Sequence, residues 1–186
     1  CLMTARLQMP RILFVALFTS TIVLLVVVFT AAPPDSGPQS PTLLPMLAVV
    51  SLAVLVMSFI LPARQQAVGL AGSKLAVTEE PDPGASEVIP YRDAPKRQVF
   101  ADPKQALKRA FGLYVPRFIL EMARSEAVAV FGFVLGFLGY PPVMFLPFFG
   151  LSWLAMAARF PTPGKVIGPL ERAFGARARH LEGELR

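Results

Sequence analysis

Two long apolar segments dominate the pattern of hydrophobic and polar positions along the chain. Residues 12–32 and 43–63 contain no charged residue, and their apolar positions surround the helix axis instead of following one face. A surface helix of a soluble protein keeps a polar face. Each segment has the length of about 20 residues that a helix needs to cross about 30 Å of hydrocarbon. The sequence therefore predicts two transmembrane helices.

The first segment must also be compared with a secretory signal peptide. The apolar core of a signal peptide spans about 7 to 15 residues. Residues 12–32 are longer than this, and a second segment of equal strength follows them. A retained span is therefore expected. Residues 33–41 (PPDSGPQSP) are rich in turn formers, and so short a loop makes the two helices antiparallel neighbours.

The second half of the chain contains a weaker pair of apolar segments, residues 126–139 and 143–160. The turn between them is predicted at residues 140–142 (YPP), because proline stops a helix and restricts the residue before it. A helix of residues 126–139 alone would rise only about 21 Å. Either this helix begins earlier, near Phe118, or the pair forms a re-entrant hairpin. We expect two spans, with a kink at Pro147.

Residues 64–124 lie between the two apolar pairs and read as a polar loop. Residues 78–97 (TEEPDPGASEVIPYRDAPKR) have the composition of a flexible linker. From Asp102, which suits a helix cap, the pattern predicts an amphipathic helix over 103–124, interrupted near Pro116. Residues 161–186 form a basic segment whose apolar spacing suits a helix on a lipid surface or a solvated helical tail.

These segments define the expected fold class, an all-α membrane protein. It has four transmembrane helices in two antiparallel hairpins, together with cytoplasmic amphipathic helices. The expected regions are an N-terminal transmembrane hairpin (1–63), a cytoplasmic loop with a linker and an amphipathic helix (64–124), a C-terminal transmembrane hairpin (125–160) and a basic amphipathic cytoplasmic tail (161–186).

The distribution of basic residues predicts the orientation of this fold. Lysine and arginine occur before residue 12, between residues 64 and 124, and from residue 159 onward, whereas the two expected turns on the other side contain none. Basic segments stay in the cytoplasm. The sequence thus predicts a multi-pass protein of the bacterial inner (cytoplasmic) membrane with both termini cytoplasmic. The net charge of +6 then has a membrane explanation and does not indicate nucleic-acid binding.

Basic side chains on the two amphipathic segments are the expected contacts with membrane lipids. Clusters of lysine and arginine next to a span are attracted to anionic headgroups. The predicted lipid-headgroup contacts are Lys104, Lys108, Arg109, Arg172, Arg177 and Arg179.

The sequence contains no catalytic or metal-binding constellation. His180 is the only histidine and Cys1 the only cysteine, so neither a histidine-based triad nor a metal site of these residues is expected within the chain. Neither standard glycine-rich phosphate loop is present. We therefore expect no enzyme activity, no cofactor and no small-molecule substrate. Cys1 is interpreted as preceding a natural start at Met3, with lipidation of Cys1 as the alternative.

Four small residues follow one face of the third predicted span. Ser125, Ala129, Gly132 and Gly136 are spaced by four, three and four positions. In lipid, small residues let two helix backbones approach closely. This face is the predicted helix-packing interface, either with the chain's own spans or with another membrane protein.

Residues 125–139 (SEAVAVFGFVLGFLG) combine one carboxylate with small, aliphatic and aromatic residues and glycines. This stretch resembles the ion-carrying C-terminal helix of the c subunit of rotary ATP synthases. The resemblance implies that Glu126 is an ion-binding carboxylate. The resemblance covers residues 125–139 alone. The other helix of that family contains a glycine repeat, which neither 12–32 nor 43–63 has. The simpler interpretation places Glu126 at the membrane interface, beside Glu121 and Arg124.

The predicted function is that of a non-catalytic accessory or assembly subunit of a larger membrane complex, acting through helix–helix and lipid contacts. Its expected partners are membrane lipids and other transmembrane subunits. The alternative is an ion- or proton-translocating component with Glu126 as the possible ion carrier. A channel is disfavoured, because a water-filled path needs polar side chains along it and the spans contain few.

Overall fold

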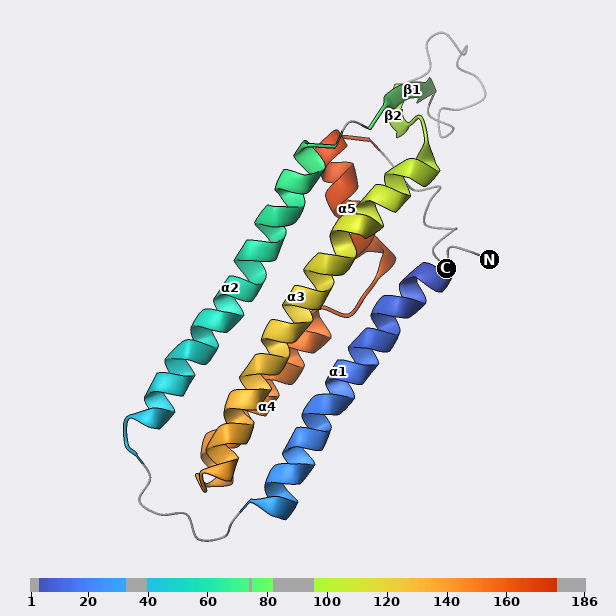
Figure 1. The fold of residues 1–186 in the computed structure, drawn as a ribbon. Helices are drawn as coiled ribbons and strands as arrows, with labels where there is room; N and C mark the ends of the chain where they lie inside the picture. Colours follow the sequence, from blue (N-terminus) through green and yellow to red (C-terminus); the bar gives the residue numbers. More distant parts are fainter. Residues whose placement is uncertain (1–3, 33–39, 74, 82–95, 177–186) are drawn as a thin grey trace. The chain divides into compact units, whose positions relative to one another are not determined.

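The computed structural model describes residues 4–32, 40–73, 75–81 and 96–176, and most of them are helical (Figure 1). The elements follow in the order α1 (Thr4–Ala31), α2 (Leu43–Ala71), β1 (Val77–Pro81), β2 (Lys96–Phe100), α3 (Pro103–Phe137), α4 (Pro142–Ala158) and α5 (Pro163–Phe174). The chain divides into two compact units. We call Gln8–Arg64 with Arg117–Pro161 the helical unit, and Cys1–Leu7, Gln65–Pro116 and Thr162–Arg186 the hairpin unit.

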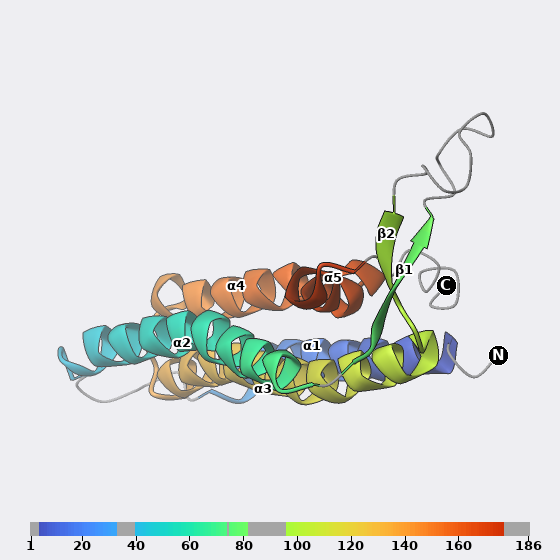
Figure 2. The same cartoon turned by 90° about the horizontal axis from the view of Figure 1, so that it is seen from above.

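The helical unit consists of parts of α1, α2 and α3 and the whole of α4, and these segments lie alongside one another (Figures 1 and 2). Short connections join α1 to α2 and α3 to α4, so that each pair is antiparallel. Large side chains fill its interior, where aromatic rings of α4 pack against α1 and α3. The buried core cluster comprises Val28, Val128, Ala129, Leu135, Tyr140, Phe145, Phe148 and Phe149.

The turn between α3 and α4 lies where the sequence predicts it. Gly139 has a φ of 76°, a left-handed conformation that glycine adopts without steric cost. The Tyr140 N–H donates to the Leu135 carbonyl at 3.1 Å and the Gly139 N–H to the Gly136 carbonyl at 3.0 Å. This pair of bonds satisfies the last carbonyls of α3 as in a Schellman motif. Pro142 then begins α4, at a position where its missing N–H costs nothing.

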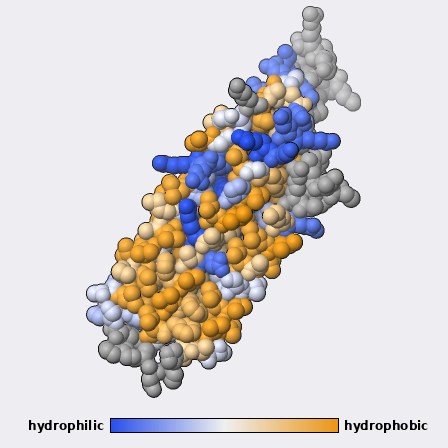
Figure 3. All heavy atoms as spheres, viewed as in Figure 1, coloured by the Kyte–Doolittle hydropathy of each residue, from blue (hydrophilic) through white to orange (hydrophobic). Residues whose placement is uncertain are grey.

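The outer surface of the helical unit is apolar. Large hydrophobic side chains are exposed on every one of its helices, including Ile12 (69% exposed), Val49 (68%), Val134 (39%) and Leu154 (70%). Figure 3 shows this on one face of the molecule, where hydrophobic residues cover most of the lower part, over the segments of α1 to α4 near the connections that join α1 to α2 and α3 to α4. Among the described residues, α1 from Leu7 and α2 are long and apolar enough to cross a membrane, and a third span results if α4 and α5 are counted together across their break.

The hairpin unit contains the two strands, α5, the end of α2 and the beginning of α3. β1 and β2 pair antiparallel, with Val77 opposite Phe100 and Pro81 opposite Lys96. The Phe100 ring packs edge-on against Phe174 of α5 at 5.8 Å between centroids. The unit buries Val99 and Phe100 of β2, Ala106, Leu107, Ala110, Phe111 and Tyr114 of α3, and Val166, Ile167 and Leu170 of α5.

The cap of α3 agrees with the sequence. The Asp102 carboxylate accepts hydrogen bonds from the backbone N–H groups of Lys104 (3.0 Å) and Gln105 (3.1 Å). These are two of the donors that the first turn of a helix leaves without a partner, and Pro103 occupies the first position.

Three details of the predicted fold are corrected by the structure. The fold is not purely helical, because the predicted linker contributes both strands. The predicted interruption at Pro116 is wrong, because α3 runs through it and on to Phe137 without a break. α2 also continues past residue 63 to Ala71. A proline within a helix removes one backbone hydrogen bond. Packing of the helix before and after Pro116 can offset this loss. The predictions for Cys1, the residue 82–95 part of the linker, Arg177 and Arg179 lie outside the described residues.

Candidate functional site

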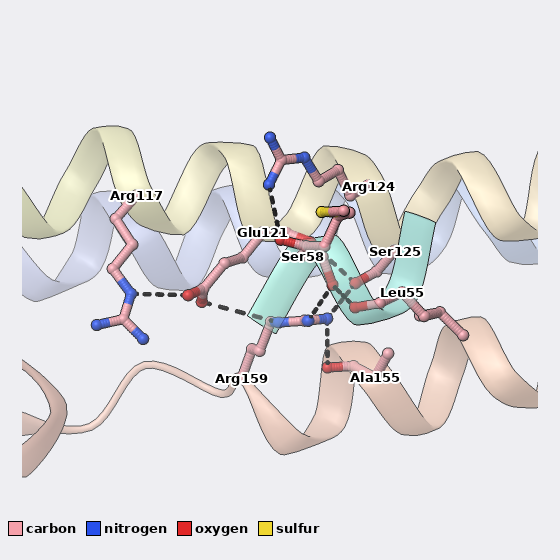
Figure 4. A network of polar contacts seen from close by, with 9 residues as sticks. Leu55, Ser58, Arg117, Glu121, Arg124, Ser125, Ala155 and Arg159 are labelled. Carbon is pink, nitrogen blue, oxygen red and sulfur yellow. Dashed lines mark hydrogen bonds and ion pairs between the residues drawn. The ribbon is translucent and has the colours of Figure 1, made fainter. Parts of the chain in front are cut away.

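The interior of the helical unit contains polar and charged side chains that are almost inaccessible. Glu121, Ser125 and Arg159 are buried, as are Ser58 of α2 and Thr21 of α1. Ionised side chains are almost never fully buried unless they are paired. Their contacts define the candidate site, a cluster of Ser58, Arg117, Glu121, Ser125 and Arg159 that we call the Arg159 network (Figure 4).

Arg159 stands directly after the last residue of α4, and its guanidinium lies between α2 and α3 (Figure 4). One terminal nitrogen, Nη1, donates to the Ser125 hydroxyl and, at 3.2 Å, to the Ala155 carbonyl. The other, Nη2, donates to the Ser58 hydroxyl at 2.5 Å. Only 5% of Arg159 is exposed, so these bonds replace part of the water that the guanidinium loses on burial, whereas its Nε makes no hydrogen bond within the described residues.

Glu121 supplies the negative charge of the network. Its Oε1 accepts a hydrogen bond from Arg117 Nε at 2.7 Å, one helical turn earlier on α3, and its Oε2 lies 3.7 Å from Arg159 Nε. One carboxylate thus lies between two guanidinium groups. The three formal charges sum to +1, and the short separations in a water-poor interior make the attraction strong.

The two serine hydroxyls of the network act as both acceptors and donors. Each accepts a hydrogen bond from Arg159. Ser125 in turn donates to the Glu121 carbonyl at 2.9 Å, and Ser58 donates to the Leu55 carbonyl at 2.7 Å. The Arg159 guanidinium also stacks over the Phe59 ring, 4.1 Å from its centroid, a favourable cation–π geometry. The network therefore fastens α2, α3 and the end of α4 to one another.

Glu126 lies outside this network and joins α3 to α1. Its Oε1 accepts a hydrogen bond from the Ser20 hydroxyl at 2.5 Å, and the residue is half-buried. The next residue of α1, Thr21, accepts a hydrogen bond from the Trp153 indole of α4 at 2.9 Å. Neighbouring positions of α1 therefore bind two different helices through polar groups.

The four small residues of α3 lie against helices of the same chain. Ser125 and Ala129 are fully buried. A Cβ atom built on Gly132 would come within 2.8 Å of Phe148 Cβ of α4, and one on Gly136 would collide with the side chain of Val28 of α1. Glycine at these two positions is what allows the close approach, as the packing of small residues in lipid requires.

The predicted lipid contacts that the structure describes lie in the hairpin unit. Lys104, Lys108 and Arg109 are exposed on α3, and Arg172 is exposed on α5. Arg109 Nε donates to the Ser73 hydroxyl at 2.9 Å, and Arg172 Nε donates to the Gly168 carbonyl at 3.2 Å. Neither bond neutralises the charge, so both side chains keep their positive charge at the surface.

Sequence reasoning did not find the Arg159 network. Part of it was visible as Arg117, Glu121 and Ser125, which recur every four residues and so follow one face of α3. Arg159, by contrast, looks like an ordinary basic residue after an apolar segment. Its burial depends on α2 and α3 meeting at that level, which spacing along the sequence does not reveal.

No protein-family model, no curated protein and no solved structure matches the chain. The resemblance of residues 125–139 to the ATP synthase c subunit therefore gains no support from a family model. Within the described parts of the chain, no group of three or more histidine, cysteine, aspartate or glutamate side chains is arranged to hold a metal ion.

Proposed function

We propose that the chain is a non-catalytic integral membrane protein with four spans, and that it serves as an accessory or assembly subunit of a larger membrane complex. One observation carries the proposal. The helical unit exposes large apolar side chains on all its helices and buries the charges of Glu121 and Arg159. This distribution suits hydrocarbon as the surrounding solvent, where exposed apolar surface costs nothing and charged groups face the bundle interior.

The helix lengths are compatible with four spans. α1 and α2 each exceed the length needed to cross the hydrocarbon. Residues 117–137 of α3 rise about 30 Å, and the 17 residues of α4 rise about 25 Å. This part of α3 is less apolar than α1 and α2, because it contains Glu121, Arg124 and Glu126. Glu121 points into the bundle and Glu126 is bonded to Ser20, so these charges need not face lipid.

One end of the helical unit carries four arginines, and the alternating direction of the helices supports a cytoplasmic position for this basic end. Arg11 precedes the apolar part of α1, Arg64 follows that of α2, Arg117 precedes that of α3 and Arg159 follows α4. Because the helices alternate in direction, all four arginines belong to the same end of the unit. Residues 12–63 and 125–158, which contain both connections at the other end, have no lysine or arginine. This asymmetry satisfies the positive-inside rule.

Several polar side chains of the helical unit bond to one another and not to a substrate path, which favours a binding role. Ser20, Ser58, Thr21 and Glu121 are all engaged in bonds between helices of the same chain. The surface left for contacts is mainly apolar, as expected for a subunit that packs against other membrane helices.

Purification in a mild detergent, with native mass spectrometry of the co-purifying chains, tests this function. We expect a stoichiometric complex with at least one other membrane protein. A monomer or homo-oligomer that purifies without any other chain, from membranes in which the protein is produced at its natural level, would refute the accessory role.

Ion or proton translocation with Glu126 as the carrier is the second candidate. The observation in its favour is that the Glu126 carboxylate of α3 accepts a short hydrogen bond from Ser20 of α1. The variant Glu126→Gln separates the two functions, because its amide oxygen still accepts the Ser20 bond but carries no charge. A carrier loses transport in proteoliposomes while the fold survives, whereas an accessory subunit keeps both its complex and the activity of that complex.

A further inference from the structure

The outer face of α2 and α3 in the helical unit carries two arginines with no acidic partner among the described residues, Arg64 and Arg124. We propose that these two side chains bind the phosphate of an anionic phospholipid, whose acyl chains lie along the apolar surface beside them. The site is distinct from the Arg159 network and from the basic residues of the hairpin unit.

Arg124 is the centre of this site. Its Nη1 donates one long hydrogen bond of 3.3 Å to the Met57 carbonyl of α2, and no carboxylate in the described chain pairs with it. A guanidinium has five N–H donors, so most of its capacity is unused. Figure 4 shows the Arg124 side chain pointing away from Arg159, and the residue is partly exposed.

The surface around Arg124 is apolar. Met57, Ile60 and Leu61 of α2 are 50%, 44% and 39% exposed, and Leu120, one turn before Arg124 on α3, is 40% exposed. Residues three, four and seven positions apart share one face of a helix, so Arg64 lies on the same face of α2 as Met57. Arg64 is exposed, two turns nearer the basic end. Two guanidinium groups thus border one apolar strip.

The depth of Arg124 identifies the anion as a headgroup phosphate. The uncharged length of α4 from Pro142 ends at Arg159, after a rise of about 25 Å. Arg159 bonds Ser125, the residue next to Arg124. Arg124 therefore lies near one edge of a hydrocarbon layer about 30 Å thick, where phosphates begin. Planar guanidinium groups match phosphate oxygens well, and basic pockets between helices bind anionic headgroups.

Native mass spectrometry of the full chain, delipidated in detergent and titrated with phosphatidylglycerol or phosphatidylcholine, tests the site. We expect the wild type to retain one phosphatidylglycerol in preference to phosphatidylcholine. Arg124→Gln and Arg64→Gln should each weaken this binding by about fivefold or more, the factor that one basic side chain contributes at an anionic surface. Lys96→Gln is the charge-matched control, because Lys96 is exposed on β2 and pairs with Glu79, and it should bind as the wild type does.

Equal binding of both lipids by the wild type, or unchanged phosphatidylglycerol binding in both arginine variants, would overturn the proposal. It also fails if Arg124→Gln loses a co-purifying membrane protein while lipid binding is unchanged, because Arg124 then pairs with a partner's carboxylate. If Arg124→Gln does not fold, Arg64→Gln decides, since Arg64 makes no polar contact within the described residues. The inference rests on the proposed membrane embedding, but different results would contradict the lipid site and the embedding. A wild type that does not stay with bilayers after reconstitution contradicts the embedding itself.

Discussion

Arg159 and Glu121 show at the residue scale how a charge is tolerated in an apolar bundle. The Arg159 guanidinium contacts three helices of the helical unit: Ser58 of α2, Glu121 and Ser125 of α3, and the Ala155 carbonyl of α4. Desolvation of the guanidinium opposes folding, and the ion pair and hydrogen bonds offset it. Removing Glu121 leaves the Arg159 charge buried without its anion, and removing Arg159 leaves Glu121 with Arg117 as its one cation.

Replacing Arg159 with leucine should destabilise the protein by about 3–5 kcal/mol, because Glu121 loses one of its two cations and both serines lose a donor. The measurement is reversible unfolding in mixed micelles. The double variant Arg159→Leu with Glu121→Leu should recover part of this loss, since neither charge then remains buried alone. Arg172→Leu, at an exposed position of α5, serves as the control. A loss below about 1 kcal/mol for Arg159→Leu would show that the network does not stabilise the fold.

The contact between α3 and α4 is the clearest feature at the scale of elements. Gly132 lies so close to α4 that an added Cβ would meet Phe148 Cβ at 2.8 Å and the Phe145 carbonyl oxygen at 3.1 Å. Neither atom is the end of a flexible side chain. The hairpin turn at Gly139 sets the two helices antiparallel, and Gly132 sets how closely they approach.

The variant Gly132→Ala should destabilise the helical unit by about 1–3 kcal/mol, the usual cost of forcing extra volume into a packed interface. Gly150→Ala is the matched control. Gly150 also lies in a helix, α4, but a Cβ atom there meets nothing within 4 Å. Alanine favours a helix over glycine by about 1 kcal/mol, so this control should be neutral or slightly stabilising. Equal effects of the two substitutions on unfolding would rule out the close contact.

At the scale of the whole molecule, the proposed topology determines which residues face each side of the membrane. A four-span topology would place the connection between α1 and α2 on the side opposite to the beginning of α3. Since Cys1 is the only cysteine, one substitution, Cys1→Ser, provides a background for single-cysteine labelling.

A cysteine at Lys108 should react with a membrane-impermeant maleimide only when the cytoplasmic side is accessible, as in inverted vesicles. A cysteine at Thr42 should react only from the opposite side, in intact cells. Both native positions are exposed. Ser51 is buried in α2, so that Ser51→Cys is the control that should not react from either side. Labelling of Lys108→Cys and Thr42→Cys from the same side would contradict the four-span topology.

The sequence by itself determined where the helices of the helical unit lie, because those elements depend on local properties. Charge-free stretches of sufficient length predicted α1 and most of α2, and the prolines after Tyr140 predicted the turn before α4. The Asp102–Pro103 pair predicted the start of α3 in the same way. Each of these signals is contained within one continuous stretch of the chain, so no tertiary information was needed.

Only the tertiary structure decided the strands, the continuity of α3 and the Arg159 network. β1 and β2 are joined by pairing across a long separation in sequence, with Val77 opposite Phe100, and their charged residues resemble a linker. α3 passes through Pro116, since packing outweighs the local preference to break. Arg159 is buried because Ser58 and Glu121, distant in sequence, meet it between three helices. Partners distant in sequence determine these features, and neither hydropathy nor spacing predicts which of those partners meet.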